Sequence, residues 1–130
     1  MRFVFAQACV LLLFAGPASA QLTDADPCPE AHGALERGNC AWAAYERADA
    51  ELNAVWKRAL AEFPSGGADR AAHREEIRAS QRAWIKYRDL DCEAISQIGT
   101  PNYWGMNKAY CLWAHTVERT RLLRRVYVGD

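Results

Sequence analysis

Histidines, serines and paired carboxylates are the side chains in this sequence that could carry out catalysis. The three histidines, His32, His73 and His115, are spread over three separate segments, and no serine has a neighbour that would activate its hydroxyl. Carboxylates stand close together in sequence at Glu75 with Glu76 and at Asp89 with Asp91. Adjacent and i,i+2 positions do not face each other on a helix, so a glycosidase-like pair would have to be assembled across helices. Because the motifs of common hydrolases and phosphate-binding loops are also missing, we expect no catalytic residue and interpret the protein as a non-enzyme.

The N-terminal segment decides which residues belong to the folded domain. Residues 1–20 combine one early charge, Arg2, with an apolar run and small residues before Gln21, which is typical of a cleaved secretory signal. The apolar run is too short for a membrane span. We therefore expect a signal peptide at 1–20, one domain at 21–130, and a periplasmic or secreted protein that is not held in a membrane. The chain has 16 basic and 16 acidic residues, so its overall charge does not indicate a nucleic-acid partner.

Cysteines are the residues with the clearest structural meaning. Four remain after the expected cleavage: Cys28, Cys40, Cys92 and Cys111. An even number in a small exported domain favours two disulfides, although four cysteines allow three pairings. A zinc site is the rival interpretation, but neither pair has C-x-x-C spacing and we find no histidine at ligand spacing from them. We therefore expect no metal and no other cofactor.

The apolar residues recur at steps of three and four along the whole mature chain. This period predicts helices over about 39–63, 69–98 and 103–126, the first two begun by the N-caps Asn39 and Asp69. No segment alternates with a period of two, so we expect no sheet. The predicted fold is all-α, a three-helix antiparallel bundle or helical hairpin with two disulfides.

The order of the helices favours one of the three disulfide pairings. The turn between the second and third helices centres near Pro101, and Cys92 and Cys111 lie almost equally far from it. Those positions face each other in an antiparallel hairpin. Cys28 and Cys40 would then tie the segment before the first helix to its first turn. Each bridge closes a loop of about 10 to 20 residues, which is worth roughly 3 kcal/mol in the chain-entropy account.

Two polar residues interrupt the apolar face of the second helix. Gln81 and Arg88 lie on the same stripe as Trp84, and on the first helix Asp49 and Asn53 stand one turn apart. Because a buried charge needs a partner, we expect Arg88 to meet Asp49, with Gln81 and Asn53 completing the hydrogen bonds. We interpret this polar cluster as a device that sets the register of the helices; a ligand-binding role is the alternative.

Three segments together resemble the lysozyme inhibitor LprI family, in its small N-terminal-type domain: "CPEAHGALERGNCAWAAYERADAELNAVW", "QRAWIKYRDLDC" and "CLWAHTVERTRLL". The resemblance covers nearly the whole mature chain. One departure is the turn between the second and third helices, which reads "GTPNYWG" where the family is usually rich in glycine and serine. The matching positions are Cys28, Cys40, Tyr45, Asp49, Leu52, Asn53, Gln81, Arg82, Trp84, Arg88, Asp89, Cys92, Cys111, Thr116, Arg119 and Leu123.

The resemblance implies a disulfide-stapled exported protein that binds and inhibits a lysozyme, or another cell-wall muramidase, by surface contact. The alternative is a structural or accessory protein of the cell envelope that binds another partner and does not inhibit lysozyme. For the binding surface we predict Tyr103 and Trp104, beside Pro101, as exposed aromatic anchors on a turn held by a disulfide. Folding of Trp104 back onto the hairpin is the competing interpretation. An acidic patch could also steer a cationic lysozyme toward the protein. Its residues are Glu36, Glu46, Asp49 and Glu51.

Overall fold

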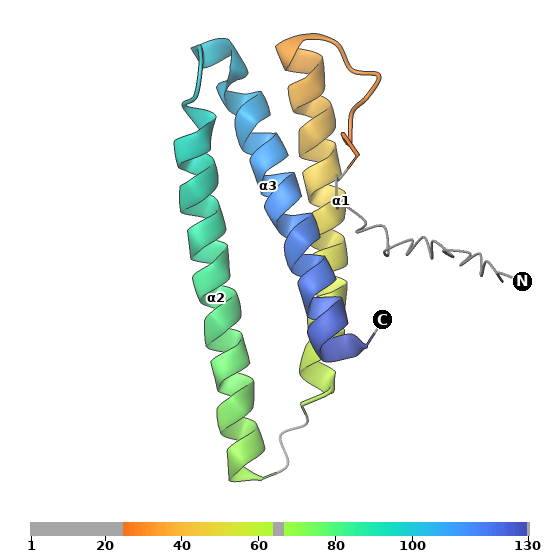
Figure 1. Ribbon diagram of the computed structural model, residues 1–130, viewed down its shortest axis with the longest axis vertical. Helices are drawn as coiled ribbons and strands as arrows, with labels where there is room; N and C mark the ends of the chain where they lie inside the picture. The colour runs from red at the N-terminus through yellow and green to blue at the C-terminus, as the bar shows by residue number, and fades with distance from the viewer. Residues whose placement is uncertain (1–24, 64–66, 130) are drawn as a thin grey trace, which may run out of the picture.

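The computed structural model describes residues 25–63 and 67–129, which form three long helices and one short π-helix (Figure 1). The helices are α1 (Gly33–Ala61), α2 (Ala68–Ser96) and α3 (Pro101–Leu123), and the π-helix η1 (Arg124–Val128) follows directly. The two described ranges contain no strand, so the predicted all-α fold is confirmed. The expected signal peptide at 1–20 lies outside the described residues. None of the described helices is long and apolar enough to cross a bilayer.

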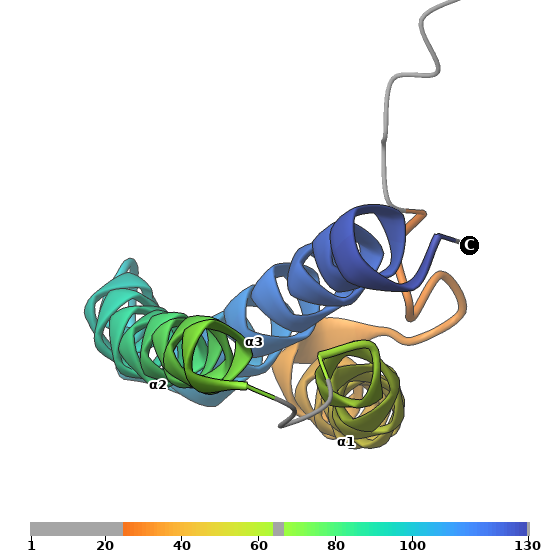
Figure 2. The same ribbon diagram turned by 90° about the horizontal axis from the view of Figure 1, so that it is seen from below.

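The helix α3 lies between the other two helices (Figures 1 and 2). It runs in the same direction as α1 and opposite to α2, so α1 and α3 begin at the same end of the bundle. Both α1 and α2 pack mainly on α3 and come close to each other at few points. The two outer helices are therefore joined through α3 and through individual side chains that bridge between them.

Small residues let α1 and α3 approach closely near the end where both begin. The buried face of α1 starts with Gly38, and a Cβ placed there would be in ordinary van der Waals contact, at 3.6 Å, with the backbone of Met106. The face continues with alanines at steps of three and four and then changes to larger residues that pack with Leu123. These buried positions are Ala41, Ala44, Ala48, Leu52, Val55 and Ala59.

The buried face of α2 is different, because most of its residues are not apolar. Ile77 is its only buried aliphatic residue, and the others are Gln81, Arg88, Cys92 and Ser96. Burial of apolar area therefore contributes less to the position of α2 than to that of α1. Its attachment depends on polar contacts and on a disulfide.

Two disulfides are present, and their pairing is the predicted one. Cys28 bonds to Cys40, with 6.0 Å between their Cα atoms, and Cys92 bonds to Cys111 with 5.4 Å. The first ties the segment before α1 to that helix, and the second joins α2 to α3. Each of these covalent links removes freedom from the unfolded chain, which is worth about 3 kcal/mol for loops of this size.

The predicted starts of the first two helices were wrong. The helix α1 begins at Gly33, so Asn39 lies inside it, and the Glu36 carboxylate accepts the His32 backbone N–H at 3.0 Å. A glutamate one turn into the helix thus accepts from the backbone N–H of the N-cap residue, and Asn39 does not stand at the helix start. In α2 the N-cap is Gly67, and Asp69 lies in the first turn, where its charge still suits the helix dipole.

The third helix also differs from the prediction at both ends. It begins at Pro101, in the first helical turn, where a missing backbone N–H costs nothing. Tyr103 and Trp104 are therefore helical residues and not part of a loop. At the other end the wider π-turn of η1 rotates the chain, so Val126 is exposed while Tyr127 and Val128 pack against the Leu52 and Leu123 cluster.

Candidate functional site

Arg88 of α2 is the centre of the first polar cluster. Its side chain is 8% exposed, and its Nη1 atom lies 3.5 Å from Oδ1 of Asp49 on α1. Its Nη2 atom lies 2.8 Å from Oδ1 of Asp89. The guanidinium carbon also lies 5.1 Å from the ring centre of Trp84 and 5.6 Å from that of Tyr45. Two carboxylates and two aromatic rings therefore replace the water that a buried guanidinium would lose.

The predicted polar cluster divides into two groups. Asn53 donates to Oδ2 of Asp49 at 3.0 Å, as expected for a residue that completes the Arg88 and Asp49 pair. Gln81 belongs to the other group, because its amide oxygen accepts from Nε of Arg119 on α3 at 2.9 Å. The Arg119 guanidinium lies 5.7 Å from the ring centre of Trp84. The ring of Trp84 thus connects the two groups.

Burial changes the proton affinity of two side chains in these groups. Desolvation raises the pKa of Tyr45 above its usual 10.0, and the neighbouring Arg88 charge opposes this shift. Desolvation lowers the pKa of Arg119 below its usual value. A tyrosine with a raised pKa stays neutral at neutral pH, and an arginine side chain keeps its charge in proteins. The cluster is therefore suited to holding helices together and not to moving protons.

A groove lies beside the Arg88 group, between α1 and α2. Its volume is about 760 Å³, and α3 closes it on one side with Lys108 and Leu112. The groove exists because the two outer helices pack on α3 and not on each other. Trp42 and Ile85 contribute apolar surface to its walls, and Arg82 contributes a positive charge. This combination is suited to a ligand that is partly apolar and partly anionic.

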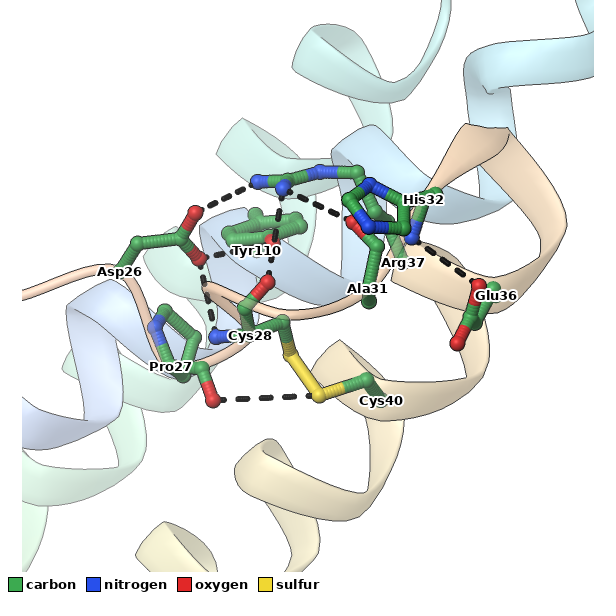
Figure 3. The surroundings of a disulfide bond; sticks show 9 residues. All are labelled: Asp26, Pro27, Cys28, Ala31, His32, Glu36, Arg37, Cys40 and Tyr110. Atoms are coloured by element: carbon green, nitrogen blue, oxygen red, sulfur yellow. Dashed lines mark hydrogen bonds and ion pairs between the residues drawn. A yellow bond between two sulfur atoms is a disulfide. The ribbon is translucent and has the colours of Figure 1, made fainter.

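A second cluster surrounds Asp26, ahead of α1 (Figure 3). Its carboxylate accepts from Nη2 of Arg37 at 2.7 Å, from the hydroxyl of Tyr110 at 2.9 Å and from the backbone N–H of Cys28 at 2.9 Å. The Arg37 guanidinium lies over the Tyr110 ring at 5.2 Å and also donates to the carbonyls of Cys28 and Ala31. Figure 3 shows these residues gathered beside the Cys28–Cys40 disulfide, so one carboxylate joins the N-terminal segment to α1 and α3.

The predicted binding residues lie at the end of the bundle where α1 and α3 begin (Figure 1). Tyr103 is 47% exposed and Trp104 is 42% exposed, and the indole N–H of Trp104 donates to the Gly99 carbonyl at 3.5 Å. Trp104 is therefore both anchored to the turn and accessible. Leu35 and Ile98, in the first turn of α1 and just after α2, are also exposed. We call Leu35, Ile98, Tyr103 and Trp104 the apolar end.

Comparison with known proteins identifies a family that matches most of the chain. Residues 26–123 match the family described as lysozyme inhibitor LprI. The chain belongs to this family. The resemblance noted in the sequence is thereby confirmed, and the LprI match begins at Asp26, so it includes both disulfides and both polar clusters. The π-helix η1 lies beyond it.

The chain is also similar to a protein whose printed name states no activity. The chain is 36% identical over 91 residues to the uncharacterized protein R02472 of Rhizobium meliloti (strain 1021). The aligned part is 65% of this chain and 65% of that relative, so the chain covers less than two thirds of the relative's length. No solved structure matches the chain.

The LprI fold also places a histidine near one disulfide, which corrects an expectation from the sequence. His115 stands one helical turn after Cys111, and one of its ring nitrogens and the sulfurs of Cys92 and Cys111 all lie within 4.8 Å of one another. Its Nε2 atom lies 2.8 Å from Oδ2 of Asp91. The prediction that no histidine lies at ligand spacing from the cysteines was therefore wrong, because Cys111 and His115 at i and i+4 share a helix face.

Sequence reasoning did not identify several residues that the structure assigns to these clusters. Asp26, Arg37 and Tyr110 carried no local signal, and the contact of Asp26 with Tyr110 joins positions 84 residues apart. Arg119 was recognised as a family position but had no assigned partner. The acidic patch is also weaker than expected, since Asp49 pairs with Arg88 and Glu51 pairs with Arg124.

Proposed function

We propose that this protein acts as a lysozyme inhibitor that binds a lysozyme or another cell-wall muramidase by surface contact, outside the cytoplasm and without turnover. Membership of the LprI family supports the class of partner. The observation that carries the proposal is the apolar end, where Tyr103 and Trp104 stay exposed in a turn of helix that is held rigidly.

Rigid aromatic residues are the usual anchors of protein interfaces. Tyr and Trp bury a large area while losing little side-chain freedom, and they dominate measured hot spots. Here the first turn of α3 fixes the backbone of Tyr103 and Trp104, and the Cys92–Cys111 bridge ties that helix to α2. The bond from Trp104 to the Gly99 carbonyl restricts the indole further. Such an anchor loses little entropy on binding, which favours affinity.

Electrostatic steering has a smaller role in this proposal than the sequence indicated. Two of the four acidic residues are neutralised by arginines, Asp49 by Arg88 and Glu51 by Arg124. The remaining charge would change the association rate more than the affinity. We therefore assign the affinity to the apolar end and expect inhibition to survive at high salt.

A second candidate function rests on the groove between α1 and α2. Its volume of about 760 Å³ is large enough for a small ligand, and Tyr45, Arg82, Arg88 and Asp89 of the family pattern line it. An accessory protein of the envelope that binds a peptide or a cell-wall fragment there, without inhibiting lysozyme, is the alternative function.

A lysis assay separates the two functions. The oxidised mature protein is titrated into lysozymes of several types, and the clearing of a cell-wall suspension is followed. We expect inhibition of at least one type that saturates with the protein and persists in high salt. Lysis of every type at the uninhibited rate, with the protein in large excess, would reject the inhibitor function and leave the groove as the candidate site.

A further inference from the structure

His115 lies beside the Cys92–Cys111 disulfide that joins α2 to α3, a position that neither the fold nor the proposed function requires. Cys92, Cys111 and His115 each place a potential metal ligand within 4.8 Å of the other two. Cys92 is fully buried, Cys111 is 9% exposed, and the His115 side chain is 21% exposed. In the oxidised protein the two sulfurs are bonded to each other, so they do not bind a metal.

We propose that reduction of the Cys92–Cys111 disulfide converts this joint into a zinc site, with Cys92, Cys111 and His115 as ligands. Two thiolates and one imidazole are a known zinc donor set, with a water in the fourth tetrahedral position. The disulfide and the metal are then alternative links at one place, and either would hold α2 against α3.

The Asp91 carboxylate gives the imidazole the partner that metal-binding histidines usually have. Oδ2 of Asp91 lies 2.8 Å from Nε2 of His115, which orients the ring and leaves Nδ1 as the coordinating nitrogen. The Tyr87 ring packs edge-on against the imidazole at 5.5 Å between centroids and restricts it further. A histidine on a rigid helix, oriented from two sides, is suited to ligation.

The distances allow the conversion with small movements. Zinc–sulfur bonds of about 2.3 Å place two sulfurs about 3.8 Å apart in a tetrahedral site. The Cα atoms of Cys92 and Cys111 are 5.4 Å apart, so rotation of the two side chains can separate the sulfurs without moving the helices.

A groove provides the route to the disulfide. Its volume is about 550 Å³, and Cys111 and His115 lie in its wall together with Tyr110 and Trp113. A thiolate from an external dithiol can attack the Cys111 sulfur from this groove, and the Cys92 sulfur leaves as a thiolate. The second thiol of the donor resolves the mixed disulfide, so two electrons and two protons pass to the protein and the donor becomes a disulfide. Zinc then displaces the two thiol protons.

The Cys28–Cys40 disulfide is an internal control for the proposed metal site. Among the described residues the Cys92, Cys111 and His115 group is the one set of three close ligand atoms, and Cys28 and Cys40 belong to no such set. The double variant Cys28→Ser with Cys40→Ser retains the proposed site. The double variant Cys92→Ser with Cys111→Ser removes it and keeps the other disulfide.

The test is a cobalt(II) titration of the first double variant after reduction with a phosphine, followed by displacement with zinc. We expect one equivalent of cobalt, a thiolate-to-cobalt absorption band, and loss of the band on adding zinc. When added to the first double variant, His115→Ala should weaken cobalt binding at least about tenfold, and Asp91→Asn should weaken it by about tenfold. The oxidised His115→Ala and Asp91→Asn proteins should melt close to the oxidised Cys28→Ser with Cys40→Ser protein that carries them, which shows that the fold is retained.

Three results would overturn the proposal. The first is the absence of a thiolate-to-cobalt band while circular dichroism shows that the reduced protein keeps its helices. The second is a reduced protein that loses its helices and does not regain them with cobalt or zinc. The third is an unchanged affinity in His115→Ala, which would assign the metal to the cysteines alone.

Discussion

The guanidinium of Arg88 on α2 lies 3.5 Å from the carboxylate of Asp49 on α1, and this ion pair links two helices that pack chiefly on α3. The buried partner is the arginine, whose side chain is 8% exposed, while Asp49 is 39% exposed. The arginine therefore determines the stability of the cluster, because its charge is the one that water cannot reach.

We predict that Arg88→Ala lowers the free energy of unfolding by about 3 kcal/mol, because it removes the ion pairs and leaves a cavity beside Trp84. Arg88→Met should change it by less than about 1.5 kcal/mol, since a flexible apolar side chain fills the space and Asp49 and Asp89 can be hydrated. Urea denaturation at neutral pH measures both. The control is Arg82→Ala, an exposed arginine of the same helix, which should stay within about 0.5 kcal/mol. Equal losses in all three variants would contradict this account of the cluster.

The Gln81 and Arg119 contact is predicted to be a second, separate link between α2 and α3. A double-mutant cycle with Gln81→Ala and Arg119→Ala should give a coupling energy of about 1 kcal/mol. The cycle of Gln81→Ala with Asp49→Ala should give a coupling close to zero, because Gln81 does not contact Asp49. A larger coupling to Asp49 than to Arg119 would show that the cluster is one network.

Asp26 is predicted to make the protein sensitive to acid. The hydrogen bond from Arg37 is the main reason that the pKa of Asp26 lies below its usual 3.8, with the backbone N–H of Cys28 next. A lowered pKa in the folded state means that the stabilisation is present above the unfolded pKa and is lost as the pH falls through the folded value. Asp26→Asn should therefore flatten the acid side of the melting-temperature profile, below about pH 4.

The control for this profile is Asp69→Asn, an exposed aspartate in the first turn of α2. Its acid profile should stay close to that of the parent. A steep acid transition that is unchanged in Asp26→Asn would mean that other carboxylates determine the acid sensitivity.

The two disulfides are predicted to stabilise different parts of the bundle. Replacing either pair with serines should lower the free energy of unfolding by about 3 kcal/mol. The two variants should differ in amide hydrogen exchange. The buried face of α2 is mostly polar, so the position of this helix depends on the disulfide to α3. Loss of Cys92–Cys111 should reduce the protection of amides throughout α2, while loss of Cys28–Cys40 should affect the first turns of α1. The same exchange pattern in both variants would contradict this division.

The sequence predicted those features that depend on local periodicity. Steps of three and four identified the helices, and the equal distances of Cys92 and Cys111 from the turn identified the disulfide pairing. The Arg88 and Asp49 contact was also predictable, because a charge on an apolar stripe requires a partner. The helix ends were not predictable from N-cap residue types. Glu36 accepts the His32 backbone N–H at the start of α1, and α3 begins with Pro101, which has no backbone N–H to satisfy.

Contacts between residues that carry no local pattern were the features that the sequence did not reveal. The Asp26 and Tyr110 hydrogen bond depends on how α3 packs beside the N-terminal segment, and neither residue has a local pattern that indicates it. Cys111 and His115 have i and i+4 spacing in the sequence, but only the packing of α2 on α3 brings Cys92 beside them. The π-turn of η1 breaks the 3.6-residue period on which the predicted helix over 103–126 rests, and Val126 at its end is exposed.

The affinity of Trp104→Ala for an inhibited lysozyme tests the central claim most directly, by calorimetric titration beside the parent and Val126→Ala. Val126 is an exposed apolar residue after α3, at the other end of that helix, and is the matched control. We predict that Trp104→Ala weakens binding by about 2 kcal/mol, or roughly thirtyfold, with a melting temperature close to that of the parent, while Val126→Ala binds like the parent. Equal affinities for the parent and Trp104→Ala would contradict the assignment of the apolar end as the binding surface.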